Sequence, residues 1–213
     1  MNLNLIFKNK KIKELTYDSV VVEKPMSNLV NFNYKTILSP PPENTSKITQ
    51  KELDIIAYAT KNRDKKDLKF VYQMDTDMDS FFISLLNKYG LIYPQQYIND
   101  FYALVEPILM NTKSFWNRPR PSQLAKLYGI DIDVIETDTI HTPSYPSGHT
   151  VYTKLVSNIL SDMYPKLSNK FVNIAKNTGI ARVQQGVHYP SDNIASFIFS
   201  DYVFKKLNKN RIV

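Results

Sequence analysis

Apolar residues return along most of this chain at the spacing of one helix face. Between residues 77 and 116, and again from residue 148 onward, they recur every third or fourth position, as in Phe81, Phe82, Leu85 and Leu86. That period is typical of amphipathic helices, whereas paired strands alternate apolar and polar residues. No pair of segments alternates in that way. The pattern therefore predicts an all-α protein with helices over residues 48–63, 77–90, 95–116, 148–164, 166–186 and 191–208.

The first part of the chain does not share the helical period. Residues 39–46 read SPPPENTS, a stiff and extended composition, and residues 19–25 are a candidate for a short strand. A chain of 213 residues is long enough for one domain with a sizeable core. We therefore expect an irregular lead-in over residues 1–46, with Ser46 or Thr49 capping the first helix of the bundle. Residues 47–213 should then form a single-domain helical bundle of about six or more helices.

The composition narrows the functional classes only in part. Lys and Arg number 27 against 20 Asp and Glu, which gives a formal net charge of +7. Such a charge is either a solvated lysine surface or a field that attracts phosphate esters, nucleic acid or acidic lipid. The absence of cysteine excludes disulfides and thiolate metal sites. No signal peptide or membrane-spanning run is visible, so we expect a soluble protein that is cytoplasmic by default.

Three short stretches carry candidate chemistry, and the first is KSFWNRPRP at residues 113–121. Lys113 falls in the last turn of the predicted third helix. The prolines at 119 and 121 force Arg118 and Arg120 into extended geometry. A stiffened arginine suits a fixed anion site, because less conformational freedom is lost on binding. The alternative, which is favoured when the stretch is taken alone, is a helix end with exposed cations.

The second stretch is PSGH at residues 146–149. Pro146 and Gly148 shape a loop that leads directly into a predicted helix, so that unpaired backbone N–H groups point outward at its N-terminus. Ser147 adds a hydroxyl donor, and His149 stands beside any anion bound there. The alternative is a capping turn that carries a solvent-exposed histidine.

The third stretch is ARVQQGVHYPSD at residues 181–192. Arg182 lies on a predicted helix and His188 in the loop after it. Asp192 follows four residues later, close enough to bond one ring nitrogen of His188 and leave the other nitrogen to attack an electrophile. The alternative is an N-cap aspartate beside a surface histidine.

Together the stretches read K-x6-R-P, P-S-G-H and R-x5-H-x3-D, in that order. This resembles the three-part signature of the type-2 phosphatidic acid phosphatase superfamily, which includes the bacterial class A nonspecific acid phosphatases and the vanadium haloperoxidases. The proline-rich lead-in is similar to that of the soluble class A enzymes. One position departs from the pattern: the family usually has serine before the arginine of the third motif, and here it is Ala181. We expect a hydrogen bond to the site to be missing there.

The resemblance implies a metal-independent phosphatase that hydrolyses phosphate monoesters through a phosphohistidine intermediate. It implies that His188 is the nucleophile, that Asp192 orients it, and that His149 is the general acid. No cofactor is implied, and vanadate is expected to act as an inhibitor that mimics phosphate. By the same resemblance the phosphate is held by Lys113, Arg120, Ser147, Gly148 and Arg182.

Other functions of the same site stay open. A vanadium-dependent haloperoxidase would hold vanadate with these residues, although such enzymes are generally longer. A lipid phosphate phosphatase is the second alternative, and a basic nucleic-acid-binding module, which rests only on the +7 charge, is the least favoured. As partners we expect small phosphate esters and no nucleic acid. Peripheral lipid contact is compatible with the basic surface, and the resemblance suggests a homodimer.

A few further residues attract attention. His141 is outside every motif, and we expect it in a loop near the mouth of the site. Phe115 and Trp116 lie between site cations, either in the core or along the substrate pocket. MDTDMDS at residues 74–80 starts like a calcium-binding loop but lacks the required glycine and glutamate. We interpret it as an acid-rich helix start.

Overall fold

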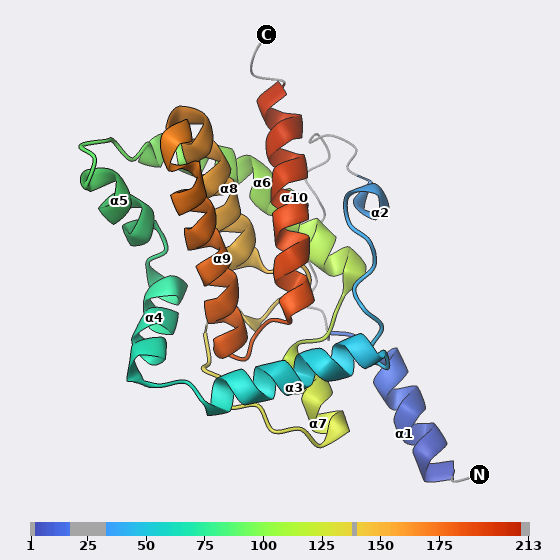
Figure 1. Ribbon diagram of the computed structural model, residues 1–213. Helices are drawn as coiled ribbons and strands as arrows, with labels where there is room; N and C mark the ends of the chain where they lie inside the picture. The colour runs from blue at the N-terminus through green and yellow to red at the C-terminus, as the bar shows by residue number, and fades with distance from the viewer. Residues whose placement is uncertain (1–2, 18–32, 138–139, 210–213) are drawn as a thin grey trace.

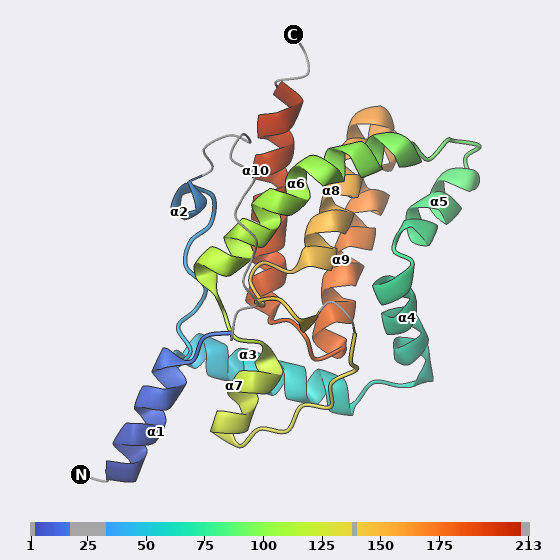
Figure 2. The same cartoon turned by 180° about the vertical axis from the view of Figure 1, so that it is seen from behind.

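The computed structural model describes residues 3–17, 33–137 and 140–209. All regular secondary structure in these ranges is helical, which confirms the all-α prediction. Four helices make the central bundle, and in Figures 1 and 2 they lie side by side. They are α6 (Gln95–Trp116), α8 (Gly148–Met163), α9 (Ser168–Gln184) and α10 (Pro190–Lys209).

Helix α8 is the centre of the bundle. It packs most extensively on α9 and α10, and residues on every side of it are buried, including Val151, Leu155 and Ile159. Phenylalanines from the neighbouring helices complete this core, among them Phe101 and Phe199. Each such side chain contributes roughly 1.5–3 kcal/mol by leaving water. The burial fixes the N-terminus of α8, where the PSGH motif lies.

Helix α3 (Lys47–Lys61) crosses beneath the lower ends of α9 and α10 in Figure 1. Ser46 is its N-cap and accepts a hydrogen bond from the Thr49 backbone N–H, so Ser46 is the capping residue of the two that the sequence offered. The short helix α7 (Pro121–Tyr128) lies against α3. Leu53 of α3 and Leu124 of α7 form a second buried apolar cluster with Tyr189, which is the neighbour of His188.

The predicted helix over residues 77–90 is shorter than expected, and another helix precedes it. Helix α5 covers Asp79–Asn87, and α4 covers Lys65–Thr76. Helix α4 is missing from the sequence prediction because KKDLKFVYQMDT is largely charged and polar. Its start is nevertheless well defined, since Asp64 and Asp67 form a reciprocal capping box. Helix α4 packs on α9, and Val71 and Met74 are the residues that it buries.

The N-terminal segment contains more helix than expected. Helices α1 (Leu3–Glu14) and α2 (Tyr34–Ile37) lie within residues 1–46. The lysine-rich sequence of α1 shows no continuous apolar face; of its described side chains, Ile12 is buried against Leu124. The candidate strand at residues 19–25 lies outside the described residues. Farther along, the predicted helix 166–186 begins with a short 3-10 turn, η2 (Pro165–Leu167).

A helix that crosses a bilayer needs about 20 consecutive, mostly apolar residues. Across residues 3–17, 33–137 and 140–209, no helix combines the necessary length and apolar content.

Candidate active site

His188 lies in the short loop between α9 and α10. Its Nδ1 lies 3.1 Å from Oδ2 of Asp192, and its Nε2 lies 3.0 Å from Nη1 of Arg120. An arginine can only donate and an ionised carboxylate can only accept. The two contacts therefore fix the tautomer: Nδ1 carries the proton, and the lone pair of Nε2 faces Arg120. A neutral imidazole held in this way is a nucleophile with a defined direction of attack.

Asp192 is itself held from several directions. Its Oδ2 also accepts hydrogen bonds from the Tyr189 backbone N–H at 2.9 Å and from Ser144 Oγ at 2.5 Å. Its Oδ1 pairs with Arg118 Nη1 at 2.5 Å. The side chain is fully buried, so these contacts replace water around a charge and keep the carboxylate in one orientation.

Arg118 therefore serves the aspartate and not an incoming anion. The guanidinium pairs with both Asp192 and Glu52, the latter at 3.1 Å, and stacks over the Tyr189 ring at 3.8 Å. Glu52 comes from α3 and also accepts the Ser191 backbone N–H at 2.6 Å. The stiff Arg118–Pro119 geometry is thus used to build a buried ion-pair network behind the nucleophile. No feature of the sequence around Glu52 predicts that it belongs to this ion-pair network.

Arg120 and Lys113 are anchored by backbone carbonyls. Arg120 donates from Nε to Thr142 O and from Nη1 to Val187 O, each at 2.8 Å. Lys113 donates from Nζ to Pro143 O at 2.7 Å. Both cations are almost fully buried. A backbone carbonyl carries no net charge, so these particular hydrogen bonds hold the two cations in place without cancelling their positive charge.

The pKa values of these cations show how concentrated the charge is. Burial, followed by the charge of Arg182, lowers the pKa of Arg120 to about 10. Burial also lowers the pKa of Lys113 well below its usual 10.5, and here Arg120 is the strongest neighbouring charge. Like charges held together in a low dielectric repel one another, and a bound dianion would relieve this repulsion.

The PSGH motif forms the N-terminus of α8, with Ser147 as the N-cap. The first-turn N–H groups of Gly148 and His149 have no acceptor within the helix, and the helix dipole favours an anion in front of them. Lys113 lies beside this turn, since a Cβ on Gly148 would meet Lys113 Cε at 3.9 Å. Ser147 has partners within the protein that the sequence did not indicate. Its Oγ lies 3.0 Å from Thr150 Oγ1, and its backbone N–H makes a long contact of 3.5 Å with Asp192 O.

Asp75 is a site residue that sequence reasoning missed. It lies in the last turn of α4, and its Oδ1 pairs with Arg182 Nη1 and with His149 Nε2, the latter at 3.3 Å. Thr137 Oγ1 donates to the same oxygen at 3.1 Å. Asp75 is the second residue of the MDTDMDS stretch, whose acidic residues the sequence assigns only to a helix start. An isolated acidic stretch gives no sign of its partner across the fold.

The two histidines differ in their surroundings. Burial lowers the pKa of His188 well below its ordinary 6.5, and the charges of Arg120 and Lys113 lower it further. Burial and the Arg182 charge also lower the pKa of His149, but contacts with Asp75 act in the opposite direction. His188 is therefore a neutral base at ordinary pH. His149 keeps a carboxylate that favours its protonated form.

Ala181, where the family usually has serine, is fully buried on α9. It packs against Val71 and Met74 of α4 in a third apolar cluster. A serine hydroxyl would lie among these side chains and would need a partner there. The alanine is thus matched to the packing of α4, the helix that brings Asp75 to the site.

The remaining singled-out residues fall into two groups. His141 is exposed and lines a small cavity of about 170 Å³ together with Arg120, in keeping with a loop residue near the site. Trp116 packs against the main core and makes an edge contact with Tyr145, with ring centroids 6.2 Å apart. Phe115 is 45% exposed and stacks edge-on against Trp116. Trp116 is therefore a core residue, and Phe115 is a surface residue beside it.

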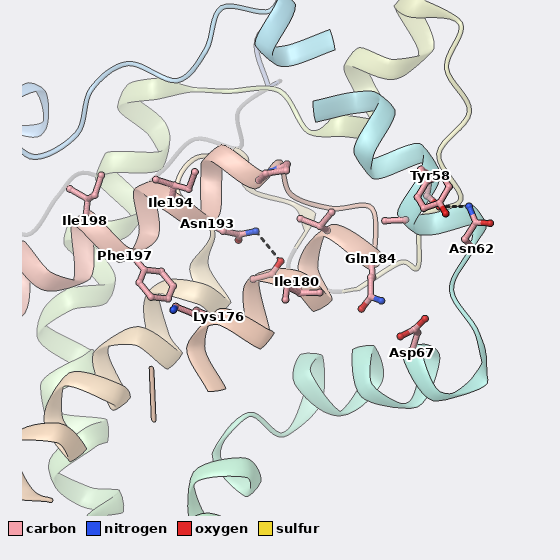
Figure 3. A pocket seen from close by; sticks show the side chains of 14 residues that line it. Tyr58, Asn62, Asp67, Lys176, Ile180, Gln184, Asn193, Ile194, Phe197 and Ile198 are labelled. Atoms are coloured by element: carbon pink, nitrogen blue, oxygen red, sulfur yellow. Dashed lines mark hydrogen bonds between the residues drawn. The ribbon is translucent and has the colours of Figure 1, made fainter. Parts of the chain in front are cut away.

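A larger groove lies apart from these residues. It has a volume of about 840 Å³ and is lined mainly by apolar side chains of α3, α9 and α10, including Tyr58, Ile180 and Ile194. Figure 3 shows Ile194, Phe197 and Ile198 along α10, with the Asn193 amide bonded to the Gly179 carbonyl at 2.9 Å. None of the site residues lines the groove.

The structure brings the sequence-predicted site residues together around one buried point. Four helices and two loops contribute to it, and the charges of Lys113, Arg120 and Arg182 all act on the His188 imidazole. The gathered residues are Lys113, Arg120, Ser147, Gly148, His149, Arg182, His188 and Asp192. Such a cluster can hold a dianion in front of an oriented nucleophile and a second imidazole.

Comparison with known proteins gives one family and one fold. Residues 101–205 match the model of the PAP2 superfamily. No curated protein matches the sequence. Among solved structures, the chain is similar to a transmembrane PAP2-type phosphatidylglycerolphosphate phosphatase from Bacillus subtilis, with a TM-score of 0.53 and 17% identity. The likeness covers 78% of this chain and 87% of the other.

Proposed function

We propose that this chain, whose residues 101–205 match the PAP2 superfamily model, is a phosphatase of that superfamily and hydrolyses phosphate monoesters through a phosphohistidine on His188. The observation that carries the proposal is the fixed tautomer of His188. Its Nε2 lone pair lies 3.0 Å from Arg120, while Asp192 holds the proton on Nδ1. A phosphate held by Arg120 is thereby brought against the one ring nitrogen that can attack it.

The reaction then has two steps. In the first, His188 Nε2 forms a bond to phosphorus while the bond between phosphorus and the ester oxygen breaks. His149 gives a proton to that oxygen, and the alcohol leaves. In the second step, water attacks the phosphohistidine, His149 accepts a proton from the water, and phosphate departs with the Nε2 lone pair restored on His188.

The charge needed for the transition state comes from the protein. Phosphoryl transfer depends mostly on positioning and on stabilising charge on the phosphoryl oxygens. Lys113, Arg120 and Arg182 supply three buried cations, and the first turn of α8 adds backbone N–H groups. We therefore propose that the reaction needs no metal ion. Vanadate, which has the charge and shape of phosphate, should compete with substrate.

The substrate class has two candidates. The resemblance to soluble class A acid phosphatases supports small, water-soluble monoesters and is our first choice. The fold likeness to a lipid phosphatase supports lipid phosphates as the second, together with the net charge of +7, which favours anionic surfaces. Comparing glycerol phosphate with a short-chain phosphatidic acid below its micelle concentration distinguishes them, because the second candidate requires a large preference for the lipid.

The test of the proposal is hydrolysis of p-nitrophenyl phosphate in EDTA, from about pH 4 to about pH 9, by wild type and by His188→Ala. Activity that survives EDTA and disappears in the variant supports it. Activity that is lost in EDTA and restored by Mg²⁺ contradicts metal independence, and activity retained by His188→Ala contradicts the assignment of the nucleophile.

A further inference from the structure

Asp75 contacts two groups that the proposed mechanism uses, yet no step of that mechanism involves it. Its Oδ1 pairs with Arg182 and with His149, and its backbone carbonyl oxygen lies 3.2 Å from His149 Nε2. The side chain is 15% exposed. Burial would raise the pKa of Asp75, but the hydrogen bond from His149 and the charge of Arg182 outweigh it and hold that pKa well below its ordinary range. Asp75 is therefore ionised.

The contacts fix which nitrogen of His149 carries its proton. Both oxygens of Asp75 that face Nε2 can only accept a hydrogen bond. Nε2 must therefore bear the proton and donate it toward Asp75. Within the described part of the chain, no hydrogen bond to Nδ1 of His149 is found. Nδ1 is consequently the ring nitrogen of His149 that can exchange a proton with the substrate.

His149 is held in the same way as the nucleophile His188, but the roles of the two ring nitrogens are exchanged. In His188, Nδ1 is held by Asp192 and Nε2 acts. In His149, Nε2 is held by Asp75. A carboxylate on one imidazole nitrogen orients the ring and stabilises its cation, so the opposite nitrogen can both give and take a proton.

We propose that Asp75 is the positioning residue of the general acid, holding Nε2 of His149 so that Nδ1 delivers the proton to the leaving oxygen. This rests on the proposed function. As the P–O bond breaks and the bond from His188 Nε2 to phosphorus forms, the Nδ1 proton of the His149 cation passes to the departing oxygen. Neutral His149 then takes a proton on Nδ1 from the attacking water in the second step, and Asp75 stays ionised throughout.

The placement of Asp75 follows from the way α4 sits on α9. Val71 and Met74 pack against Ala181, and Thr178 Oγ1 contacts Met74 Sδ at 3.3 Å. This apolar contact places the last turn of α4 over Arg182, which directly follows Ala181 in the sequence. Ala181, which departs from the family pattern, and the carboxylate of Asp75 are therefore parts of one packing arrangement.

The charges around His149 determine how its proton affinity changes when Asp75 is neutralised. Arg182 on α9 lowers the pKa of His149, and the His188 imidazole is coupled to it. Asp75 on α4 is the anion that opposes them. Neutralising Asp75 removes the charge that opposes Arg182 at this ring, so the proton affinity of His149 must fall. We expect a decrease of about 10-fold from the loss of one adjacent opposite charge.

The first measurement is an NMR titration of the imidazoles in wild type, Asp75→Asn and Asp77→Asn. The chain has 3 histidines, so the resonances are assigned with single His→Gln variants. Asp77 is the matched control: it lies at the same end of α4, is exposed, and bonds Ser80 instead of the site. Asp75→Asn should lower the proton affinity of His149 about 10-fold relative to wild type, and Asp77→Asn should leave it unchanged. An unchanged His149 titration in Asp75→Asn overturns the proposal, whether or not the protein is an active phosphatase.

The second measurement is kcat/KM for a good and a poor leaving group, p-nitrophenyl phosphate and glycerol phosphate. Only the poor leaving group needs the proton, so Asp75→Asn should lower kcat/KM for glycerol phosphate by about 10- to 100-fold. The value for p-nitrophenyl phosphate should change by less than about 3-fold. Asp75→Glu, which keeps the charge, should recover part of the loss, and Asp77→Asn should match wild type.

The outcomes separate the two proposals. An equal loss for both esters means a structural role for Asp75, and a gain for both means that Asp75 merely competes with phosphate for Arg182; either result overturns the positioning role. A wild type that hydrolyses neither ester refutes the proposed function, while the NMR titration still decides whether Asp75 holds His149.

Discussion

Arg120 donates a hydrogen bond from Nη1 to Nε2 of His188 across 3.0 Å. The same nitrogen of Arg120 also donates to the Val187 carbonyl, so two hydrogen bonds hold the guanidinium beside the imidazole. This contact keeps the nucleophilic lone pair unprotonated and marks where a phosphoryl oxygen would be held. The contact and the elements that support it lead to four testable expectations.

Arg120→Lys should lower kcat/KM for p-nitrophenyl phosphate by about 10²- to 10³-fold, the usual cost of losing one preorganised donor to a transition state. Lysine keeps the charge but cannot reach Thr142 O, Val187 O and the phosphate in one planar arrangement. Steady-state kinetics measures this. A loss below about 3-fold would show that charge alone suffices and would contradict the positional role of the guanidinium.

The pH profile of kcat/KM should be a bell with its maximum below about pH 6.5, the ordinary histidine value. His188 must be neutral, and its pKa is well below that value, so the acid limb lies at low pH. His149 must be protonated, and its pKa is also lowered, so activity falls as pH rises through it. The profile is measured in EDTA with glycerol phosphate, whose poor leaving group needs the proton from His149, and is corrected for substrate ionisation. A rate that keeps rising through about pH 9 contradicts these assignments.

Gly186→Ala should destabilise the fold more than Gly129→Ala does. Both glycines have positive φ, 83° and 72° respectively, so both substitutions carry the strain of about 1–2 kcal/mol for a left-handed residue. A Cβ at Gly186 would also lie 2.9 Å from Ile132, whereas Gly129 faces open space. Thermal unfolding measures the difference. Because Gly186 is two residues before His188, its variant should also lose activity that Gly129→Ala retains.

Glu52→Gln should lower the free energy of unfolding by about 2–4 kcal/mol, because it leaves Arg118 and the Ser191 N–H short of a buried acceptor. Asp133→Asn is the control. It removes the partner of Arg63 at a carboxylate that is 72% exposed, and should cost less than about 1 kcal/mol. Urea denaturation of the two variants checks the contrast. Equal effects would mean that the network behind Asp192 contributes no more than a surface pair.

The sequence was sufficient for the parts of the site that are encoded locally. Pro119 and Pro121 around Arg120, the PSG turn before His149, and the four-residue spacing from His188 to Asp192 each restrict the backbone by themselves. The helical period also predicted α6 with the observed bounds and α8, α9 and α10 to within two residues at each end. In these cases local sterics and burial favour the same structure.

The parts that the sequence did not reveal depend on contacts between distant segments. Helix α4 is more polar than the helices of the central bundle, and its packing against Ala181 is visible only in the fold. Asp75 meets Arg182, and Glu52 meets Arg118, across 107 and 66 residues of sequence. A single acidic residue on a helix is usually solvated, and its pattern gives no indication of a partner so far along the chain.

The most direct test of the account is to identify the phosphorylated residue. The enzyme is mixed with p-nitrophenyl phosphate, quenched in base, where phosphohistidine survives, and digested for mass spectrometry. The account predicts a phosphoryl group on the peptide that contains His188, absent in His188→Ala and more abundant in His149→Ala if that variant slows hydrolysis of the intermediate. A phosphoryl group on another residue, or turnover without any phosphorylated peptide, would contradict it.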